Sequence, residues 1–219
     1  MTALPRVIHQ TWFGPKEPPH AYMNTWRKRN PGWTYRLWRD GDAELFPLRN
    51  QDGYDWFTRF NIKSDFARWE LVHRFGGVYV DADIICLRPL DDYLPRFYRD
   101  AWASQDCGWP SLVCSGVMGA TAGHPFAAAM VEALARVPRT SKTIHGGMTT
   151  GQGLVTKVLD AGFRDQVQVV PREVFLTRAH VFPTLPAAVQ RAVFAINADL
   201  GRHRQDPSRV VIDPAWLVC

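Results

Sequence analysis

The 219-residue chain has few of the features that mark several large classes of protein. Its four cysteines form no Cys-x-x-Cys pair and have no histidine at zinc-finger spacing, which argues against a structural zinc site. It has no internal repeat, and hydrophobic residues make up 46% of it, which excludes a repeat array and wholesale disorder. We interpret the cysteines as reduced thiols of a cytoplasmic protein, with a Cys107–Cys114 disulfide as the alternative.

Long apolar runs are also missing. The longest stretch without Asp, Glu, Lys or Arg covers residues 107–131, but two prolines, a histidine and four glycines interrupt it, so it is a poor membrane span. The N-terminus lacks the basic and then apolar order of a secretory signal. We therefore expect no transmembrane segment. The net charge of +5 is too small to identify a polyanionic partner.

Short β-like runs alternate with helical patterns, which is typical of an α/β domain. The clearest helix, at 62–75, carries an apolar stripe and ends at Gly76-Gly77, where glycine permits the left-handed turn that closes many helices. We expect one domain over 1–219, with no element assigned in the last forty residues. The expected strands are 6–12, 33–38, 78–80, a pair within 111–120, and 167–170, with 84–87 extended; the other helices are 20–29, 124–136 and 153–161.

Two Asp-x-Asp patterns occur in the chain. In an extended segment Asp81 and Asp83 would point to the same side, and two such oxygen donors suit Mn²⁺ or Mg²⁺. The pattern alone is weak, because sixteen Asp in 219 residues produce about one such pair by chance. The other pair, Asp40-Gly41-Asp42, is interpreted as a turn and helix cap, because glycine between carboxylates favours a loop.

The surroundings distinguish Asp81-Ala82-Asp83 from the other pair. It ends a hydrophobic strand, and α/β sheets bind ligands at the carboxyl ends of their strands. The helix just upstream carries Asp65 and Arg68, which are three residues apart and so lie on one face. A solvated surface ion pair is the simplest interpretation of those two residues. Their closeness to the acidic pair favours a site instead.

These residues resemble the signature of the DXD-motif sugar transferases of glycosyltransferase family 32, whose core is related to that of the large clostridial glucosylating toxins. The resemblance runs in order over about the first 155 residues. It is carried by 5–12 (PRVIHQTW), 30–33 (NPGW), 63–71 (KSDFARWEL), 76–83 (GGVYVDAD) and 150–154 (TGQGL).

The resemblance implies a GT-A type fold, which is a Rossmann-like α/β domain with a mixed central sheet flanked by helices. It also implies transfer of a sugar from a nucleoside diphosphate sugar with retention of configuration. Asp83 would be the direct ligand of a Mn²⁺ or Mg²⁺ ion, and Asp81 would contact the ribose, the sugar or the metal's water shell. Asp65 and Arg68 would hold donor-sugar hydroxyls. The remaining donor-binding residues would be His9, Gln10, Trp12, Gly77 and Gln152.

Several further features leave alternatives open. The glycine-rich loop 145–153 leads into a helix and is either a flexible surface loop or a cradle for the diphosphate or the acceptor. The family's late His-x-x-x-Ser-Trp-like stretch is absent, so the third metal ligand is open among Asn197, Asp199 and His203, with His203 preferred. Trp26, Trp33, Trp38 and Trp56 are expected to pack in the core, whereas Trp102 and Trp109 are expected either there or beside the acceptor.

The sequence therefore predicts a metal-dependent retaining glycosyltransferase that uses a UDP- or GDP-sugar. The acceptor is expected to be a glycan hydroxyl, with a modified DNA base as the alternative. Two other classes remain open: a catalytically silent module that binds nucleotide sugars, and a metal-dependent phosphodiesterase.

Overall fold

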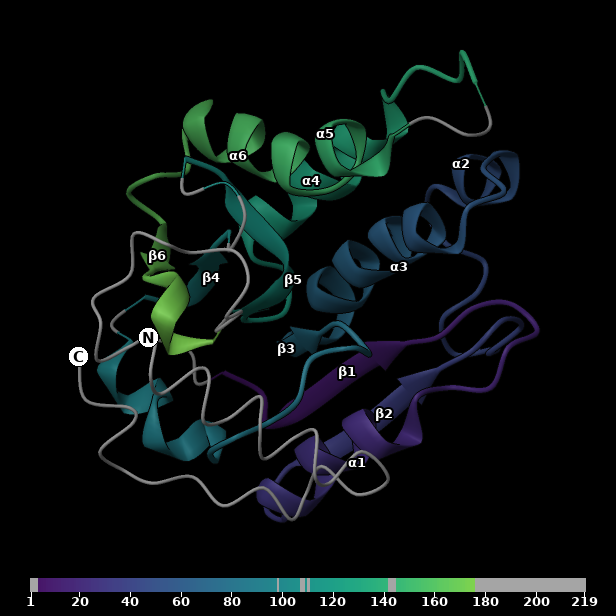
Figure 1. Cartoon of the computed structure of the whole chain (residues 1–219). Helices are drawn as coiled ribbons and strands as arrows, with labels where there is room; N and C mark the ends of the chain where they lie inside the picture. The colour runs from purple at the N-terminus through teal and green to yellow at the C-terminus, as the bar shows by residue number, and fades with distance from the viewer. Residues whose placement is uncertain (1–3, 98, 107–108, 110, 142–144, 176–219) are drawn as a thin grey trace.

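The computed structural model describes residues 4–97, 99–106, 109, 111–141 and 145–175. Figure 1 shows one central sheet with helices on both sides. The strands are β1 (Val7–Thr11), β2 (Thr34–Trp38), β3 (Gly77–Val80), β4 (Ala101–Gln105), β5 (Val113–Ala120) and β6 (Val167–Val170). The helices are α1 (His20–Arg29), α2 (Gln51–Trp56), α3 (Phe60–Phe75), α4 (Pro125–Ala135), α5 (Gly146–Thr149) and α6 (Gln152–Asp160), with short 3₁₀ turns at Leu90–Asp92, Leu94–Arg96 and Arg172–Val174.

The sheet is mixed, as expected. Its strand order is β2-β1-β3-β5-β4-β6. The strands β2, β1 and β3 are parallel to one another, β5 is antiparallel to both β3 and β4, and β6 is parallel to β4. β5 therefore runs opposite to the other five strands. We call β2-β1-β3 the parallel half of the sheet and β5-β4-β6, which contains the reversed strand, the antiparallel half; β3 and β5 meet at the boundary between them.

Alternating side chains on the strands divide the core between the two faces of the sheet. On β3, Tyr79 packs with α3 and α4, whereas Val78 and Val80 pack with Trp26 of α1 on the other face. In Figure 1, α3 to α6 lie above the sheet and α1 lies below it. Within the described part of the chain, no helix is long and apolar enough to cross a membrane.

Two glycines make the corner between α3 and β3. Gly76 ends the helix, its N–H bonding to the Val72 carbonyl, and it has a φ of 63°; Gly77 follows with a φ of 92°. A Cβ on Gly77 would lie 2.5 Å from the carbonyl oxygen of Val7 on β1. Only glycine fits such a position, so the predicted glycine turn is confirmed.

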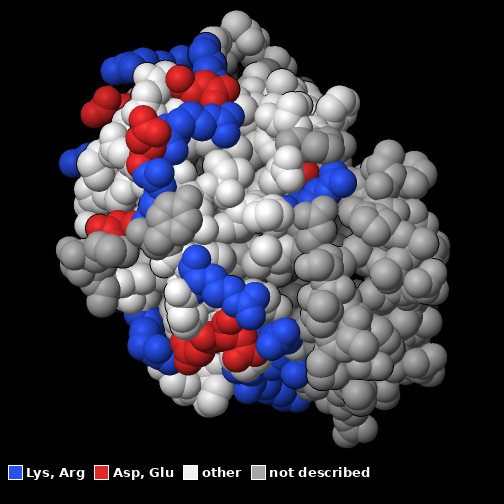
Figure 2. All heavy atoms as spheres, turned by 90° about the vertical axis from the view of Figure 1, so that its left-hand side faces the viewer, with Lys and Arg blue, Asp and Glu red and all other residues white. Residues whose placement is uncertain are grey.

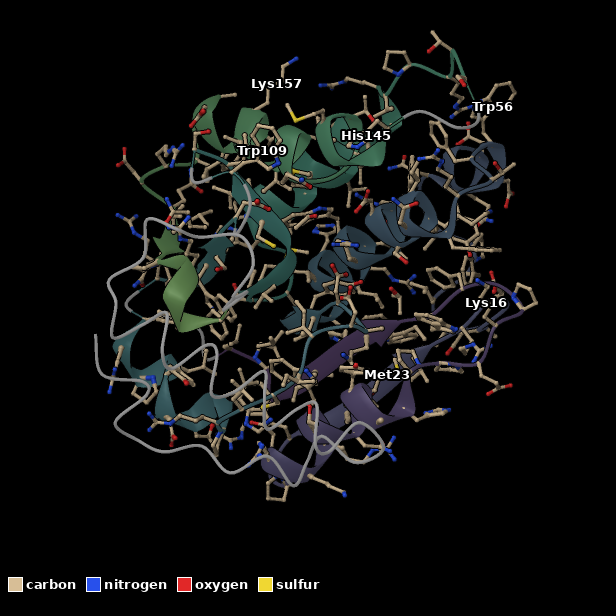
Figure 3. The ribbon with its side chains drawn as sticks, viewed as in Figure 1. Lys16, Met23, Trp56, Trp109, His145 and Lys157 are labelled. Atoms are coloured by element: carbon tan, nitrogen blue, oxygen red, sulfur yellow. The ribbon has the colours of Figure 1, made fainter. Side chains whose placement is uncertain are left out.

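Four predictions about local structure are wrong. The segment 111–120 holds a single strand, β5, and its antiparallel partner is β4, which the sequence did not suggest. Residues 84–87 form no strand, because a turn at Asp81–Ile84 ends the extended run. Asp42 caps a turn rather than a helix, since its side chain accepts from the N–H of Glu44. Trp56 is exposed at the end of α2 (Figure 3), whereas Trp26, Trp33 and Trp38 are buried as expected.

Candidate functional site

The site is built around Asp81, the first residue after β3. Its backbone N–H donates to the carbonyl of Gly116 on β5, at 2.8 Å, so the carboxyl end of β3 is held against the antiparallel half of the sheet. The Asp81 side chain is 33% exposed. A carboxylate at the end of a central strand lies where α/β sheets bind their ligands.

Arg68 of α3 lies beneath this carboxylate, and its side chain is only 5% exposed. Its Nη2 lies 3.2 Å from Asp65 Oδ1 and 3.1 Å from Asp81 Oδ1, and its Nη1 donates to the carbonyl of Ser115. The guanidinium also lies 4.8 Å from the centre of the Tyr79 ring. One buried cation therefore joins α3, β3 and β5, and the predicted pairing of Asp65 with Arg68 extends to Asp81.

A second set of bonds fixes Asp81 from the side of β1. The Tyr79 hydroxyl donates to Asp81 Oδ1 at 3.0 Å and is itself 2.9 Å from the hydroxyl of Thr11. On the opposite side, a Cβ at Gly116 would lie 2.5 Å from Asp81 Oδ2. The carboxylate therefore has two fixed hydrogen-bond donors on one oxygen, and its other oxygen needs the clearance that Gly116 provides.

The glycine-rich loop reaches the site through a side chain. The Thr150 hydroxyl donates to Asp65 Oδ2 at 2.6 Å, and Thr150 is completely buried. The N–H groups of Thr150 and Gly151 both donate to the carbonyl of Gly146. Those two amides are thus not free for a phosphate, and the loop contacts the cluster through the Thr150 hydroxyl, which the sequence did not single out.

The pKa values in the cluster are set by burial and by the Arg68 guanidinium, which lies close to the carboxylates of both Asp65 and Asp81. Burial raises the pKa of Asp65 to about 6, although Arg68 and the Thr150 hydroxyl both lower it. Burial likewise raises the pKa of Asp81 against the attraction of Arg68. The pKa of Arg68 is raised, because its acidic neighbours outweigh its own burial. Asp65 and Asp81 share the single cation Arg68, so its positive charge offsets the cost of burying each carboxylate only in part.

Asp83 contrasts with this network, because it is exposed and makes no hydrogen bond or ion pair to the described residues. The turn at Asp81–Ile84 replaces the extended geometry on which the same-side argument rested. Among the described residues, no group of three or more His, Cys, Asp or Glu could hold a metal ion. The chemistry still fits a Mn²⁺ or Mg²⁺ ion that keeps water or phosphate ligands, because the exposed carboxylate of Asp83 lies two residues beyond the fixed carboxylate of Asp81.

The other predicted donor residues lie in different environments. Trp12 follows β1, and its indole N–H donates to the carbonyl of Lys16. The Gln10 side chain is buried and bonds both to the Asp81 carbonyl and to the Tyr35 hydroxyl. Gly77 forms the corner described above, and Gln152 begins α6 beside Gly147. Their contact with a donor stays a prediction.

His9 lies in the core behind the site. It is completely buried, its Nε2 is 2.9 Å from the carbonyl of Gly76, and its Nδ1 accepts from the indole of Trp38. Burial lowers the pKa of His9 to about 4, so the ring is neutral at pH 7. Because both ring nitrogens are used, His9 secures the glycine corner and does not line a nucleotide pocket. His203, Asn197 and Asp199 lie outside the described residues.

The two tryptophans near the predicted acceptor side differ. Trp102 is 2% exposed and stacks on Phe175 at 4.9 Å, so it belongs to the core. Trp109 is 65% exposed, at the end of the molecule that also carries His145 and Lys157 (Figure 3). Cys86 and Cys114 are free thiols, whereas Cys107 and Cys219 lie outside the described residues.

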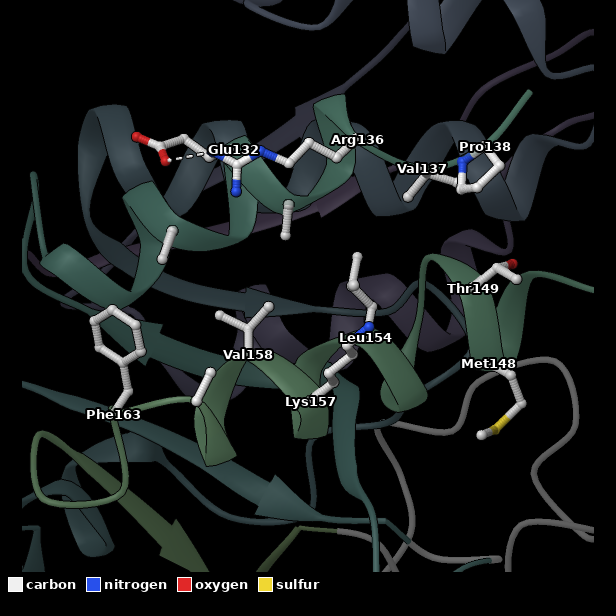
Figure 4. A pocket seen from close by; sticks show the side chains of 13 residues that line it. Glu132, Arg136, Val137, Pro138, Met148, Thr149, Leu154, Lys157, Val158 and Phe163 are labelled. Carbon is white, nitrogen blue, oxygen red and sulfur yellow. Dashed lines mark ion pairs between the residues drawn. The ribbon is translucent and has the colours of Figure 1, made fainter.

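A groove of about 530 Å³ runs between α4 and the α5–α6 segment (Figure 4). Its lining is mostly apolar, with Leu154 and Val158 facing α4 across it. Arg136 and Lys157 are its basic side chains, and Glu132 pairs with Arg136 at 3.7 Å. Thr149 also lines the groove, and the next residue is the Thr150 that bonds to Asp65. The groove and the buried cluster are therefore linked by two neighbouring residues of the chain, Thr149 and Thr150.

Comparison with known proteins identifies relatives of this site. The family described as "Glycosyltransferase sugar-binding region containing DXD motif" matches residues 18–109, which include the buried cluster up to Asp83. "Inositol phosphoceramide mannosyltransferase 3" of Schizosaccharomyces pombe is 32% identical over 153 residues, covering 65% of this chain and 40% of that protein. "Mannosyl phosphorylinositol ceramide synthase CSH1" of Saccharomyces cerevisiae is 29% identical over 143 residues, covering 60% of this chain and 35% of that protein.

Two solved structures share the fold. "PaToxG Glycosyltransferase" has a TM-score of 0.62 at 14% identity, covering 74% of this chain and 70% of that one. The UDP-bound glycosyltransferase domain of the YGT toxin has a TM-score of 0.54 at 10% identity, covering 97% of this chain and 88% of that one. The curated relatives are longer, and the chain spans about 40% of the length of the first two. Residues 18–109 thus match the DXD-motif glycosyltransferase family, and the chain has the α/β, GT-A type fold of these toxin domains.

Proposed function

We propose that the protein transfers a hexose from a nucleoside diphosphate sugar to a hydroxyl, with retention of configuration and with a bound Mn²⁺ or Mg²⁺. The observation that carries this proposal is the buried cluster of Asp65, Arg68 and Asp81, with the free carboxylate of Asp83 beside it. Several named relatives are mannosyltransferases, and mannose is therefore the first donor sugar to test.

In this proposal the residues divide the work. Asp83 and the outer oxygen of Asp81 would hold the metal, which when bound neutralises charge on the diphosphate leaving group. Asp65, ionised above its pKa of about 6, would accept hydrogen bonds from donor-sugar hydroxyls. Arg68 keeps Asp65 and Asp81 at fixed positions relative to each other.

A same-face mechanism accounts best for retention. A double displacement needs a carboxylate that is free to bond to the sugar. Both oxygens of Asp65 are engaged, one by Arg68 and one by Thr150. The Asp81 Oδ1 oxygen is engaged by Arg68 and Tyr79, and in this proposal the other Asp81 oxygen and Asp83 would hold the metal. We therefore propose that the departing phosphate oxygen takes the acceptor proton.

The acceptor proposed is a glycan or polyol hydroxyl, carried on an anionic lipid in the first instance. The groove beside α5 supports this, because its apolar lining suits a hydrocarbon chain and Arg136 and Lys157 suit a phosphate. Two relatives are named for inositol phosphoceramide. Described basic and acidic side chains alternate on the face in Figure 2 and form no continuous basic patch, so that face does not favour a DNA acceptor.

The test is sugar transfer or donor hydrolysis with UDP- and GDP-sugars, in Mn²⁺, in Mg²⁺ and in EDTA. Activity is expected only with metal and is expected to be lost in Asp83→Asn. Asp42→Asn is the matched control, because Asp42 belongs to the other Asp-x-Asp pair and lies in a separate turn. Full activity in EDTA, or equal loss in both variants, would contradict the proposal.

The alternative is a module that binds nucleotide sugars without turnover. It is favoured by the absence, among the described residues, of a third metal-ligating side chain beside Asp81 and Asp83. Calorimetry would then detect UDP or GDP binding, while no acceptor in a panel of glycans, lipid-linked polyols and modified DNA would be glycosylated.

A further inference from the structure

The position of Asp83 depends on the backbone of one turn. Its side chain makes no hydrogen bond or ion pair to the described residues, so nothing in this part of the chain fixes the carboxylate directly. The turn is closed by the N–H of Ile84, which donates to the carbonyl of Asp81 at 3.2 Å. Any movement of the segment Asp81–Ile84 would therefore move the Asp83 carboxylate.

Two buried side chains hold that turn, one at each end. Gln10 of β1 donates its Nε2–H to the carbonyl of Asp81 at 3.1 Å. Trp26 of α1 donates its indole N–H to the carbonyl of Ile84 at 2.7 Å. Gln10 is completely buried and Trp26 is 3% exposed. Both bonds are partly buried, and a partly buried carbonyl that lost its donor would be costly to leave unpaired.

Groups outside the site fix the Gln10 side chain and bind the segment that follows the turn. The Tyr35 hydroxyl of β2 donates to Gln10 Oε1 at 2.7 Å, which turns the amide N–H₂ toward Asp81. Arg27 lies over the Tyr35 ring, 4.7 Å from its centre. On the other side, the segment after the turn is bound to α1, because the N–H of Cys86 donates to the hydroxyl of Thr25.

We propose that Gln10 and Trp26 are positioning residues for Asp83, and that Tyr35 acts on the same turn through Gln10. They hold the backbone on which Asp83 meets the divalent cation, without touching cation or sugar. The inference rests on the proposed function. It gives Gln10 a different role from the predicted donor contact and gives Trp26 a role beyond core packing. Side chains that support metal ligands typically change metal affinity 10–100-fold when mutated.

The test compares Trp26→Phe and Gln10→Leu with Trp33→Phe. Trp33 is a matched control, because it is buried on the same face and its indole N–H also donates one bond, to Asp91, away from the turn. Free Mn²⁺ is measured by electron paramagnetic resonance in the presence of UDP. The dissociation constant for Mn²⁺ is expected to rise about tenfold in Trp26→Phe and Gln10→Leu and to stay unchanged in Trp33→Phe.

Saturating Mn²⁺ is expected to restore most of the turnover of both variants, which a general loss of folding would not allow. Tyr35→Phe removes the hydroxyl that orients Gln10 and so tests whether Tyr35 acts on the turn through Gln10. Tyr35→Phe should raise the Mn²⁺ dissociation constant by a smaller factor than Gln10→Leu does. The double variant Tyr35→Phe/Gln10→Leu should bind Mn²⁺ as Gln10→Leu alone does. If Gln10→Leu does not fold, Trp26→Phe and Tyr35→Phe decide the matter.

Two failures are distinguishable. If the unchanged protein binds neither Mn²⁺ nor UDP, the proposed function fails and this inference fails with it. If the unchanged protein binds both and the folded variants bind Mn²⁺ as well as Trp33→Phe does, the positioning role is wrong while the proposed function stands.

Discussion

The two halves of the sheet meet at Asp81 and contribute to it in different ways. The parallel half contributes buried polar side chains: Gln10 and Thr11 of β1 act on the turn and on Tyr79. The antiparallel half contributes space and backbone: β5 offers the clearance at Gly116 and the carbonyl of Ser115. In Figure 1, β1 lies on one side of β3 and β5 lies on the other.

One half thus contributes buried polar bonds and the other contributes a backbone carbonyl and clearance to the same site. Buried polar side chains in the middle of a sheet are costly unless they are hydrogen-bonded, and those of β1 are bonded to the segment that carries the acidic pair. The apolar groove lies on the other side, against α4 and α6. We infer that the parallel half holds the donor and metal and that the antiparallel half selects the acceptor.

The largest effect is expected where the two halves are joined, at Arg68. Arg68→Met leaves the buried carboxylates of Asp65 and Asp81 without their shared cation. Removing one partner from a buried ion pair typically lowers the free energy of unfolding by about 3–5 kcal/mol. Urea unfolding at pH 7 measures it. Arg139→Met, which breaks the exposed pair with Asp52, is the control and should change stability little. Equal losses in both variants would mean that Arg68 does not join the halves.

Thr150→Val is expected to have the next largest effect, and that effect depends on pH. The hydroxyl of Thr150 lowers the pKa of Asp65, which burial raises from 3.8 to about 6. A carboxyl with a raised folded-state pKa stabilises the fold below its unfolded pKa, and that stability is lost as pH rises through the folded pKa. Without the hydroxyl, the pKa of Asp65 rises further.

Thr150→Val should therefore lower the free energy of unfolding by about 2 kcal/mol at pH 8, and the difference should vanish toward pH 4. Denaturant unfolding at several pH values measures this dependence. Thr150→Ser, which keeps the hydroxyl, should behave as the unchanged protein. A loss that is the same at pH 4 and pH 8 would show that Thr150 acts by packing rather than by its bond to Asp65.

Gly116→Ala tests the clearance that the antiparallel half provides. The new Cβ would lie 2.5 Å from Asp81 Oδ2, so the carboxylate must move. Because the Asp81 side chain is partly exposed, it can shift toward solvent, and we expect a loss of only about 1 kcal/mol in stability. Mn²⁺ affinity, however, is expected to fall about tenfold or more. Gly32→Ala is the control, because its new Cβ would meet only the flexible end of Arg6. Calorimetric titration with Mn²⁺ measures the affinity of both variants, and only Gly116→Ala should bind the ion more weakly.

Much of the fold could be predicted, because most of its elements have strong local patterns. The apolar stripe of α3, the glycine corner and the β-branched run of β3 were all readable from the sequence. The strand β4, with the sequence AWASQ, was missed because it contains no β-branched residue, although its first four residues are buried. A strand of this kind is set by its neighbours β5 and β6 rather than by its own propensity.

The site was predictable where its residues are neighbours in sequence and not where they come from distant elements. Helical spacing placed Asp65 and Arg68 on one face, but spacing does not reveal that Thr150 and Ser115 complete their bonds. Gly116 did carry a signal, since an isolated glycine within a strand suggests a close approach. The family resemblance placed His9 and Gln10 at a nucleotide pocket, and it does not reveal their buried bonds to distant groups, to the carbonyl of Gly76 and to the hydroxyl of Tyr35.

The smallest effect on stability is expected for Asp83→Asn. It should be much smaller than the effect of Asp81→Asn, although the two residues belong to the same Asp-x-Asp pair. Asp83 is exposed and makes no bond to the described residues, and its charge raises the pKa of Asp81. Asp83→Asn should therefore change the free energy of unfolding by no more than about 0.5 kcal/mol. Asp81→Asn should lower it clearly, because the carboxylate bonds to Arg68 and Tyr79. Thermal unfolding measures both, without and with Mn²⁺ and UDP. Only the unchanged protein should gain stability from the ligands, and an equally large gain in Asp83→Asn would remove Asp83 from the metal site.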